Sequence, residues 1–310
     1  METQSIPETM IEAVRTFANP EVAHDFFVGI RWPNGVACPL NCGSVAVAYM
    51  PKRHRWYCRD CKGQFTVKRG TIFEDSPIGF DKWLPAIWLV ASNRNGVSSC
   101  EIARALHVTQ KTAWFMLHRI REAMKNESFE APFAGPVEAD ETYVGGKVRH
   151  GRPGRTGIKA KGPQAGKTVV MGILERKGKV RAFVVPSTRR MTLQEKVREH
   201  VEPGATLYTD ALASYTGLRE DYVHFVINHA VEYVRGHVHT NSIESFWSVF
   251  KRTIKGTYIA PRPQHLQRYV EEQVFRFNER ENEDGPRFAS ALEGVKGKRL
   301  TYKALTNTQD

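Results

Sequence analysis

The run Pro136-Val-Glu-Ala-Asp140-Glu-Thr-Tyr-Val144 carries the most informative pattern of this 310-residue chain. Apolar and β-prone residues surround an acidic pair, which predicts a strand that bears carboxylates near its end. A second predicted strand, 206–210, ends at Asp210 in the same way. Side chains at the carboxyl ends of strands in an open α/β sheet lie at the edge of the sheet, where ligands bind, rather than in its core. We therefore expect Asp140 and Asp210 to lie close together.

A third acid, Glu244, belongs to a predicted helix over about 241–255. Asn241, Glu244, Ser248 and Lys251 recur along one face of that helix. Seven residues of helix rise about 10 Å, so Lys251 could hold a phosphate next to a site at Glu244. A second face is apolar and predicts packing against the sheet; it comprises Ile243, Phe246, Trp247, Phe250 and Ile254.

Three carboxylates from two strands and one helix form the kind of ligand set that divalent cations bind through oxygen. In two-metal sites one ion activates the nucleophile and the other stabilises the leaving oxygen of a phosphodiester. Each acid alone is more often a surface residue or a helix cap, so the joint pattern carries the hypothesis. We predict two Mg²⁺ or Mn²⁺ ions per active site, bound by Asp140, Asp210 and Glu244.

The stretches around these acids predict a mixed α/β domain over 136–282. Further strands are expected at 168–174, 180–185 and 222–228, and further helices at 191–201 and 263–281. Strands that are followed by alternating helices and strands favour a mixed sheet. Residues 283–310 are polar and are expected to form a C-terminal tail.

A cysteine cluster predicts a second kind of site over 37–70. Cys38-Pro-Leu-Asn-Cys42 is followed after fifteen residues by Cys58-Arg-Asp-Cys61. Two close cysteine pairs at this separation indicate one tetrahedral Zn²⁺ held by four thiolates. Gly43 and Gly63 would allow tight turns. Four protein ligands leave no open position, so the zinc ion would be structural, and short strands between the pairs predict a zinc ribbon. The alternative is a set of unrelated buried cysteines, and the fifth cysteine, Cys100, is expected to be a small core residue.

Residues 78–126 are expected to be helical and to include a helix-turn-helix-like segment. Ser98 to Glu101 reads as a capping box, His107 to Thr109 as a break, and 110–124 as a second helix. The exposed start of that helix could reach base edges, through Gln110, Lys111 and Thr112. Arg119 and Arg121 could meet phosphates. An ordinary helical hairpin shows the same spacing and is the alternative.

The overall charge favours a polyanionic partner. Lys and Arg number 45 against 33 Asp and Glu, a net charge of +12, and neutralising phosphates drives binding to nucleic acid. The basic, glycine-rich segment 145–168 predicts a mobile arm that grips DNA, with Arg149, Arg152 and Arg155 as candidate contacts. A solvated linker is the alternative.

Other features of the sequence restrict the class of protein. No apolar run is long enough for a membrane span, and residues 1–36, expected to hold one short helix and a loop, lack a secretory leader. We expect a cytoplasmic protein, in which cysteines serve as metal ligands more often than as disulfides. Four further histidines, His224, His229, His237 and His239, could form a second zinc site, assist the metal or phosphate, or simply pack.

The chain resembles the DDE-type insertion-sequence transposases, in particular the ISXO-like group with a zinc ribbon before an RNase H-like catalytic domain. The resemblance covers roughly 36–280. It rests on Asp140-Glu-Thr-Tyr-Val-Gly-Gly146, Asp210 and His239-Thr-Asn-Ser-Ile-Glu244-Ser-Phe-Trp, with Lys251-Arg252 after them. Later matches are Gly256-Thr-Tyr258, His265-Leu-Gln-Arg-Tyr269 and Phe275-Arg-Phe-Asn278.

This resemblance implies hydrolytic nicking at the ends of a mobile element, then attack of the 3′-hydroxyl on target DNA. Asp140 and Asp210 would be the first two metal ligands. Glu244 or Asn241 would be the third; Glu244 is favoured because it is charged and keeps the seven-residue step to Lys251. Lys251 and Arg252 would contact DNA, both element ends and target, and a homo-oligomer on paired ends is implied. The alternatives are a DNA-binding regulator without catalysis and a stand-alone RNase H-like nuclease.

Overall fold

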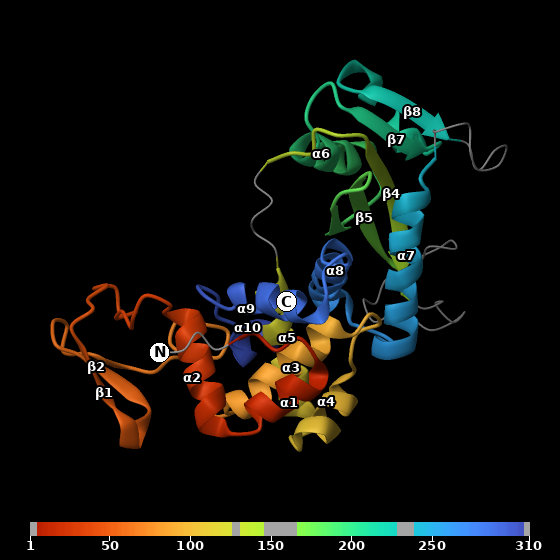
Figure 1. Cartoon of the computed structure of the whole chain (residues 1–310). Helices are drawn as coiled ribbons and strands as arrows, with labels where there is room; N and C mark the ends of the chain where they lie inside the picture. Colours follow the sequence, from red (N-terminus) through yellow and green to blue (C-terminus); the bar gives the residue numbers. More distant parts are fainter. Residues whose placement is uncertain (1–4, 126–130, 146–165, 228–238, 307–310) are drawn as a thin grey trace. The chain divides into compact units, whose positions relative to one another are not determined.

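The chain forms two compact units in its computed structural model, which describes residues 5–125, 131–145, 166–227 and 239–306 (Figure 1). The helical unit comprises 1–125 together with 279–310, and the sheet unit comprises 126–278. The sheet unit is therefore inserted into the chain of the helical unit. Within the described ranges, no helix is long and apolar enough to cross a membrane.

The sheet unit is built on one mixed sheet whose strands run in the order β6-β5-β4-β7-β8. The pairs β4–β5 and β5–β6 are antiparallel, whereas β4–β7 and β7–β8 are parallel. The mixed α/β prediction is confirmed, and the architecture is consistent with an RNase H-like fold. The strands are β4 (Val137–Val144), β5 (Thr168–Glu175), β6 (Val180–Val185), β7 (Thr206–Asp210) and β8 (Val223–Ile227).

Helices cover both faces of this sheet, because successive side chains of a strand point to opposite faces. One face packs Ala139 and Ile173 against Leu193 of α6 (Arg190–His200). The other packs Val170 and Leu174 with α7 (Asn241–Thr253) and α8 (Pro263–Asn278). After β7 come two short 3₁₀ turns, Ala213–Tyr215 and Leu218–Glu220, and α7 continues into a π-helical turn, Ile254–Tyr258.

A glycine on β5 lets α7 approach the sheet closely. A Cβ atom at Gly172 would lie 2.7 Å from the Trp247 ring and 3.0 Å from Ile243 Cδ1. Gly172 pairs with Asp140 in the β4–β5 ladder. The tight contact therefore brings α7 against the part of the sheet that carries the first candidate acid.

The helical unit contains the zinc ribbon and seven helices among its described residues. The ribbon sheet is antiparallel and runs β1-β2-β3, with β1 (Val47–Met50), β2 (Arg55–Cys58) and β3 (Gln64–Phe65). The helices are α1 (Met10–Phe17), α2 (Pro20–Arg31), α3 (Phe80–Ser92), α4 (Ser99–Leu106), α5 (Gln110–Met124), α9 (Asp284–Glu293) and α10 (Tyr302–Thr306).

The expectation of a loop after the first helix was wrong, because α2 occupies most of that stretch. Asn19 caps this helix: its Oδ1 accepts from the backbone N–H of Glu21 at 2.9 Å. Pro20 fills the first helical position. Both signals are legible in the sequence, since Asn caps and Pro at the first position are typical helix starts.

The expectation of a polar tail was also wrong, because residues after 283 complete the core of the helical unit. Phe288 on α9 is fully buried. Its ring centroid lies 5.7 Å from that of Phe17, 6.4 Å from Phe26 and 5.1 Å from Trp88. Phe288, together with the buried Ala291 and Leu292, thus docks one face of α9 in this core.

Phe288→Ala is expected to lower the free energy of unfolding by about 3–5 kcal/mol, the usual cost of emptying a buried aromatic site. Urea denaturation of the whole chain, followed by circular dichroism, measures this loss. Ile11→Ala removes a largely exposed apolar side chain of the same unit and should cost about 0.5 kcal/mol or less. Equal, small losses for both variants would show that α9 does not belong to this core.

Candidate active site and zinc-ribbon site

The strand register places Asp140 and Asp210 beside each other. In the parallel β4–β7 pair, Ala139 lies opposite Thr209, so the next residues of the two strands are neighbours about 5 Å apart. β7 ends at Asp210. There the backbone N–H of Leu212 donates to Asp210 Oδ1 at 3.0 Å. Asp210 thus stands where β7 gives way to a turn, whereas Asp140 lies within β4 rather than at its end, where the sequence predicted it.

Asp140 points from the sheet toward α7. Its Oδ2 accepts a hydrogen bond from Trp247 Nε1 at 3.0 Å. Burial raises the pKa of Asp140 to about 6, and the charges of Asp210 and Glu244 act in the same direction. The carboxylates from β4, β7 and α7 therefore lie within electrostatic range of one another.

Glu244 occupies the first turn of α7 and is exposed to solvent. The hydroxyl of Thr240, the residue before the helix, donates to Glu244 Oε1 at 3.2 Å. Asn241 is the first residue of α7, and Lys251 and Arg252 lie in its last turn; all three are exposed. The predicted apolar face of the helix is buried throughout: Ile243, Phe246, Trp247, Phe250 and Ile254.

The chemistry of these donors suits a divalent cation. Among the described residues, no Lys, Arg or His forms an ion pair with Asp140 or Asp210, and only the four cysteines place three or more ligand atoms all within 4.8 Å of one another. The acids thus approach without forming a closed cluster. A bound cation would offset the repulsion between these carboxylates, which raises the pKa of Asp140. The acids therefore suit the role of cation ligands that the sequence predicted for them.

Glu141 is a fourth acid near Asp140 and Asp210, and no separate role was predicted for it from the sequence. It lies on the face of β4 opposite to Asp140, and its Oε2 accepts from the buried Tyr215 hydroxyl at 2.9 Å. Burial raises the pKa of Glu141 to about 7, with a further contribution from the charge of Asp210. The adjacent acids in the sequence could have signalled it.

The described histidines of this region make separate contacts. His224 is buried, and its Nε2 lies 2.9 Å from Thr209 Oγ1, so it packs within the sheet. His239 Nδ1 lies 3.5 Å from Glu138 Oε1. His229 and His237 lie outside the described residues, as do the candidate DNA contacts Arg149, Arg152 and Arg155.

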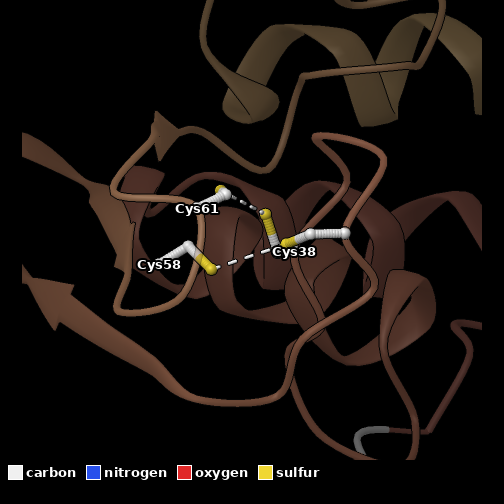
Figure 2. A group of neighbouring side chains, drawn as sticks. Cys38, Cys58 and Cys61 are labelled. Carbon is white, nitrogen blue, oxygen red and sulfur yellow. Dashed lines mark hydrogen bonds between the residues drawn. The ribbon is translucent and has the colours of Figure 1, made fainter.

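The four predicted zinc ligands form one cluster, with all four sulfur atoms within 4.8 Å of one another. Cys38 Sγ lies 3.7 Å from Cys61 Sγ, and Cys42 Sγ lies 3.6 Å from Cys58 Sγ. Figure 2 shows the side chains of Cys38, Cys58 and Cys61 converging. Sulfurs bound at about 2.3 Å to a tetrahedral zinc ion would lie about 3.8 Å apart. The cluster therefore fits a structural Zn²⁺.

The thiols of this cluster differ in their readiness to ionise. Backbone N–H groups, that of Cys61 first, lower the pKa of Cys58 to about 6. Burial raises the pKa of Cys38 to about 12. Zinc binds thiolates and releases protons on binding. Cys58 is thus ready to ligate the metal, whereas Cys38 would lose its proton as zinc binds.

Residues in the left-handed region turn the chain around both cysteine pairs. Asn41 has φ 66°, Gly43 φ 62° and Lys62 φ 59°. Gly63 matters for space, because a Cβ atom there would lie 2.4 Å from Leu40 Cδ1 and 3.3 Å from Cys61 Sγ. The first glycine thus supplies a turn, and the second lets the two cysteine loops pack together.

The helix-turn-helix-like segment has the expected elements. Ser98 and Glu101 form a capping box at α4, and His107 ends that helix in the left-handed region with φ 50°. Gln110 and Lys111 are exposed at the start of α5, and Thr112 is half-buried. Gln110 Nε2 also donates to Ser99 Oγ at 2.8 Å, which ties α5 to α4.

Three expectations about this segment were wrong. Arg119 and Arg121 are buried, with 5% and 1% exposure, so neither is placed to meet phosphates. Arg119 Nε donates to the carbonyl of Leu300 at 3.1 Å, a contact from a distant segment that local spacing does not reveal. Cys100 is exposed rather than a core residue.

The chain thus combines a four-cysteine ribbon, a set of helices and an inserted mixed sheet with acids on β4, β7 and α7. Comparison with known proteins gives the family. Residues 132–278 match the model of the ISXO2-like transposase domain, and residues 18–64 match that of the transposase zinc-ribbon domain. The chain belongs to this family of insertion-sequence transposases.

Two relatives support this assignment. The chain is 29% identical over 259 residues to an uncharacterised protein in transposable element ISH50 of Halobacterium salinarum, covering 77% of this chain and 84% of the relative. It is 36% identical over 106 residues to an uncharacterised transposase-like protein of Haemophilus influenzae, covering 34% of this chain and 85% of the relative. No solved structure matches the chain significantly.

Proposed function

We propose that this transposase cleaves DNA strands at the ends of its element and joins the resulting 3′-hydroxyl to target DNA. The observation that carries the proposal is the placement of Asp140 and Asp210 side by side on β4 and β7. Glu244 lies close enough for its charge to raise the pKa of Asp140. A regulator without catalysis has no need for like charges held together at a partly buried site.

In this proposal Asp140, Asp210 and Glu244 hold two Mg²⁺ or Mn²⁺ ions. Such ions lower the pKa of the attacking group and offset charge on the reacting phosphate. Trp247 fixes Asp140 through its Nε1 hydrogen bond, and the Leu212 N–H fixes Asp210. We take Glu244 rather than Asn241 as the third ligand, because Glu244 is charged and keeps the seven-residue step to Lys251. Asn241, one turn away, would support the ligands from outside.

We propose that exposed basic and polar groups position DNA around this site. Lys251 and Arg252 face solvent at the end of α7 and would hold phosphates. Gln110, Lys111 and Thr112 at the start of α5 would contact base edges or the backbone. Arg149, Arg152 and Arg155 would add contacts from the basic segment. Phosphate contacts by such groups make binding fall steeply with salt.

Transposition joins two element ends to one target, so we propose that the chain acts as a homo-oligomer on paired ends. The domains would divide the work as expected from the sequence: the zinc ribbon over 37–70 and helices over 78–126 bind DNA, and the sheet domain over 136–282 carries the chemistry.

Incubation of the whole chain with DNA that carries the element ends, with Mg²⁺ or Mn²⁺, tests this function. Breaks at the element boundary that leave a 3′-hydroxyl, and joined products with added target DNA, are expected on a sequencing gel. Omission of the metal should prevent both. DNA that is bound but never broken with either metal would contradict the proposal and favour a regulator.

A further inference from the structure

A buried carboxylate on β4 holds the start of α7. Glu138 is fully buried, and its Oε2 accepts a hydrogen bond from the backbone N–H of Ile243 at 3.0 Å. Ile243 is the third residue of α7, and N–H groups at this position need an acceptor from outside the helix. The residue before the helix, Thr240, supplies no such cap bond from its side chain. A strand therefore caps this helix.

An arginine completes the arrangement. Arg176, just after β5, donates from Nε to Glu138 Oε1 at 2.8 Å. Its other nitrogens reach the entry to α7, where Nη2 donates to the carbonyl of His239. Its guanidinium lies 3.8 Å from the centroid of the Tyr208 ring on β7. A buried carboxylate is tolerated when it is paired and hydrogen-bonded in this way.

Each candidate metal ligand lies one or two residues from a member of this arrangement. Glu138 precedes Asp140 by two residues on the same face of β4, and Tyr208 precedes Asp210 by two on β7. Ile243 directly precedes Glu244 on α7. Glu138, Arg176 and Tyr208, here called the α7 anchor, thus connect the three backbone segments that carry the acids.

We propose that the α7 anchor is a set of positioning residues that fixes the distance from Glu244 to Asp140 and Asp210 and thereby sets the affinity for the catalytic cations. The proposal rests on the proposed function of the acids. Groups that orient metal ligands from outside commonly change metal affinity or activity about 10–100-fold when they are mutated.

Arg176→Met gives the sharpest test, because loss of its charge and loss of its positioning effect on Glu244 predict opposite changes in cation affinity. Removal of a nearby positive charge alone would tighten cation binding. If the α7 anchor positions Glu244, Arg176→Met should instead raise the Mn²⁺ concentration for half-saturation by about tenfold or more. Electron paramagnetic resonance of free Mn²⁺, titrated into the whole chain without DNA, measures binding independently of catalysis. The cleavage rate at saturating DNA should show the same shift in its dependence on Mn²⁺.

Two further variants separate the anchor from general stability. Arg276→Met removes another buried arginine of the sheet unit, paired with Glu272 on α8. This variant should lower the melting temperature but leave the Mn²⁺ titration unchanged. Tyr208→Leu alters the α7 anchor without a change of charge and should weaken Mn²⁺ binding several-fold. If Arg176→Met does not fold, the Mn²⁺ titration of Tyr208→Leu still tests the α7 anchor.

The outcomes distinguish the inference from the function on which it rests. The anchor alone would be overturned by the following set of results. The wild type binds Mn²⁺ and Asp140→Asn abolishes that binding, while Arg176→Met binds Mn²⁺ equally well or more tightly and Tyr208→Leu binds it equally well. Wild-type protein whose Mn²⁺ titration does not differ from that of Asp140→Asn would overturn the proposed metal site, and the anchor with it.

Discussion

Asp140→Asn should reduce the rate of strand cleavage by about a thousandfold or more, a typical scale for the loss of an essential catalytic group. Asparagine offers a neutral oxygen where the carboxylate offered a charged one, so cations would bind poorly at β4. The shape is preserved, and an amide oxygen can still accept from Trp247 Nε1, now 3.0 Å from Asp140 Oδ2. Folding and binding of element ends should therefore survive.

Cleavage of labelled end DNA under single-turnover conditions measures the rate, and fluorescence anisotropy measures end binding. Glu202→Gln is the matched control, because Glu202 is an exposed acid of the same unit; its cleavage rate should equal that of the wild type. Should Asp140→Asn cleave at the wild-type rate, Asp140 would have to be removed from the active site and the reaction assigned elsewhere.

Cys58→Ser is expected to lower the zinc content from about one ion per chain to a small fraction and to unfold the ribbon. Cys58 is buried, and its sulfur lies 3.6 Å from Cys42 Sγ, so its loss opens the tetrahedron. The ribbon has few buried side chains of its own, chiefly Trp56 and Phe65. Small domains of this kind depend on metal, with binding worth about 10–16 kcal/mol in zinc-finger peptides.

Inductively coupled plasma mass spectrometry of the purified chain measures the zinc, and limited proteolysis followed by mass spectrometry locates the unfolded segment. Cys100→Ser provides the control, because Cys100 is exposed and lies outside the cluster. This variant should contain as much zinc as the wild type. Wild-type protein that contains no zinc after purification without chelators would contradict the ribbon interpretation.

Local patterns were sufficient to predict the strands of the sheet unit and helix α7. The acids on β4 and β7 and the apolar face of α7 are properties of short windows, and the structure contains all three elements. Asp210 ends β7 as predicted, whereas β4 continues past Asp140 to Val144. The cysteine spacing likewise determined the four-sulfur cluster. Periodicity and ligand spacing are local, so a single sequence suffices to read them.

Properties that depend on distant partners could not be predicted in this way. Arg119 looks like a phosphate contact on a helical wheel, yet it is buried beside Leu300 near the other end of the chain. Glu138 reads as an ordinary strand residue, and only the docking of α7 makes it a helix cap. Tertiary packing decides whether a polar side chain is buried and which group it contacts, and local propensity does not encode that packing.

The missed helices have different explanations. The start of α2 is legible in Asn19, which caps the helix, and in Pro20, which fills its first position. The docking of α9 depends on Phe288 meeting aromatic residues from the first third of the chain. Phe288, Ala291 and Leu292 do recur at helical spacing, but a helix of ten residues carries only a short local signal of burial.

The interruption of the helical unit by the sheet unit has a consequence for synthesis. Chains emerge from the ribosome N-terminus first and their domains fold as units, but α1–α5 must wait for α9, which follows more than 150 residues later. The nascent helical unit would therefore stay incomplete, with the aromatic surface that receives Phe288 uncovered, until the sheet unit has been translated. A prematurely terminated product would lack a finished helical unit.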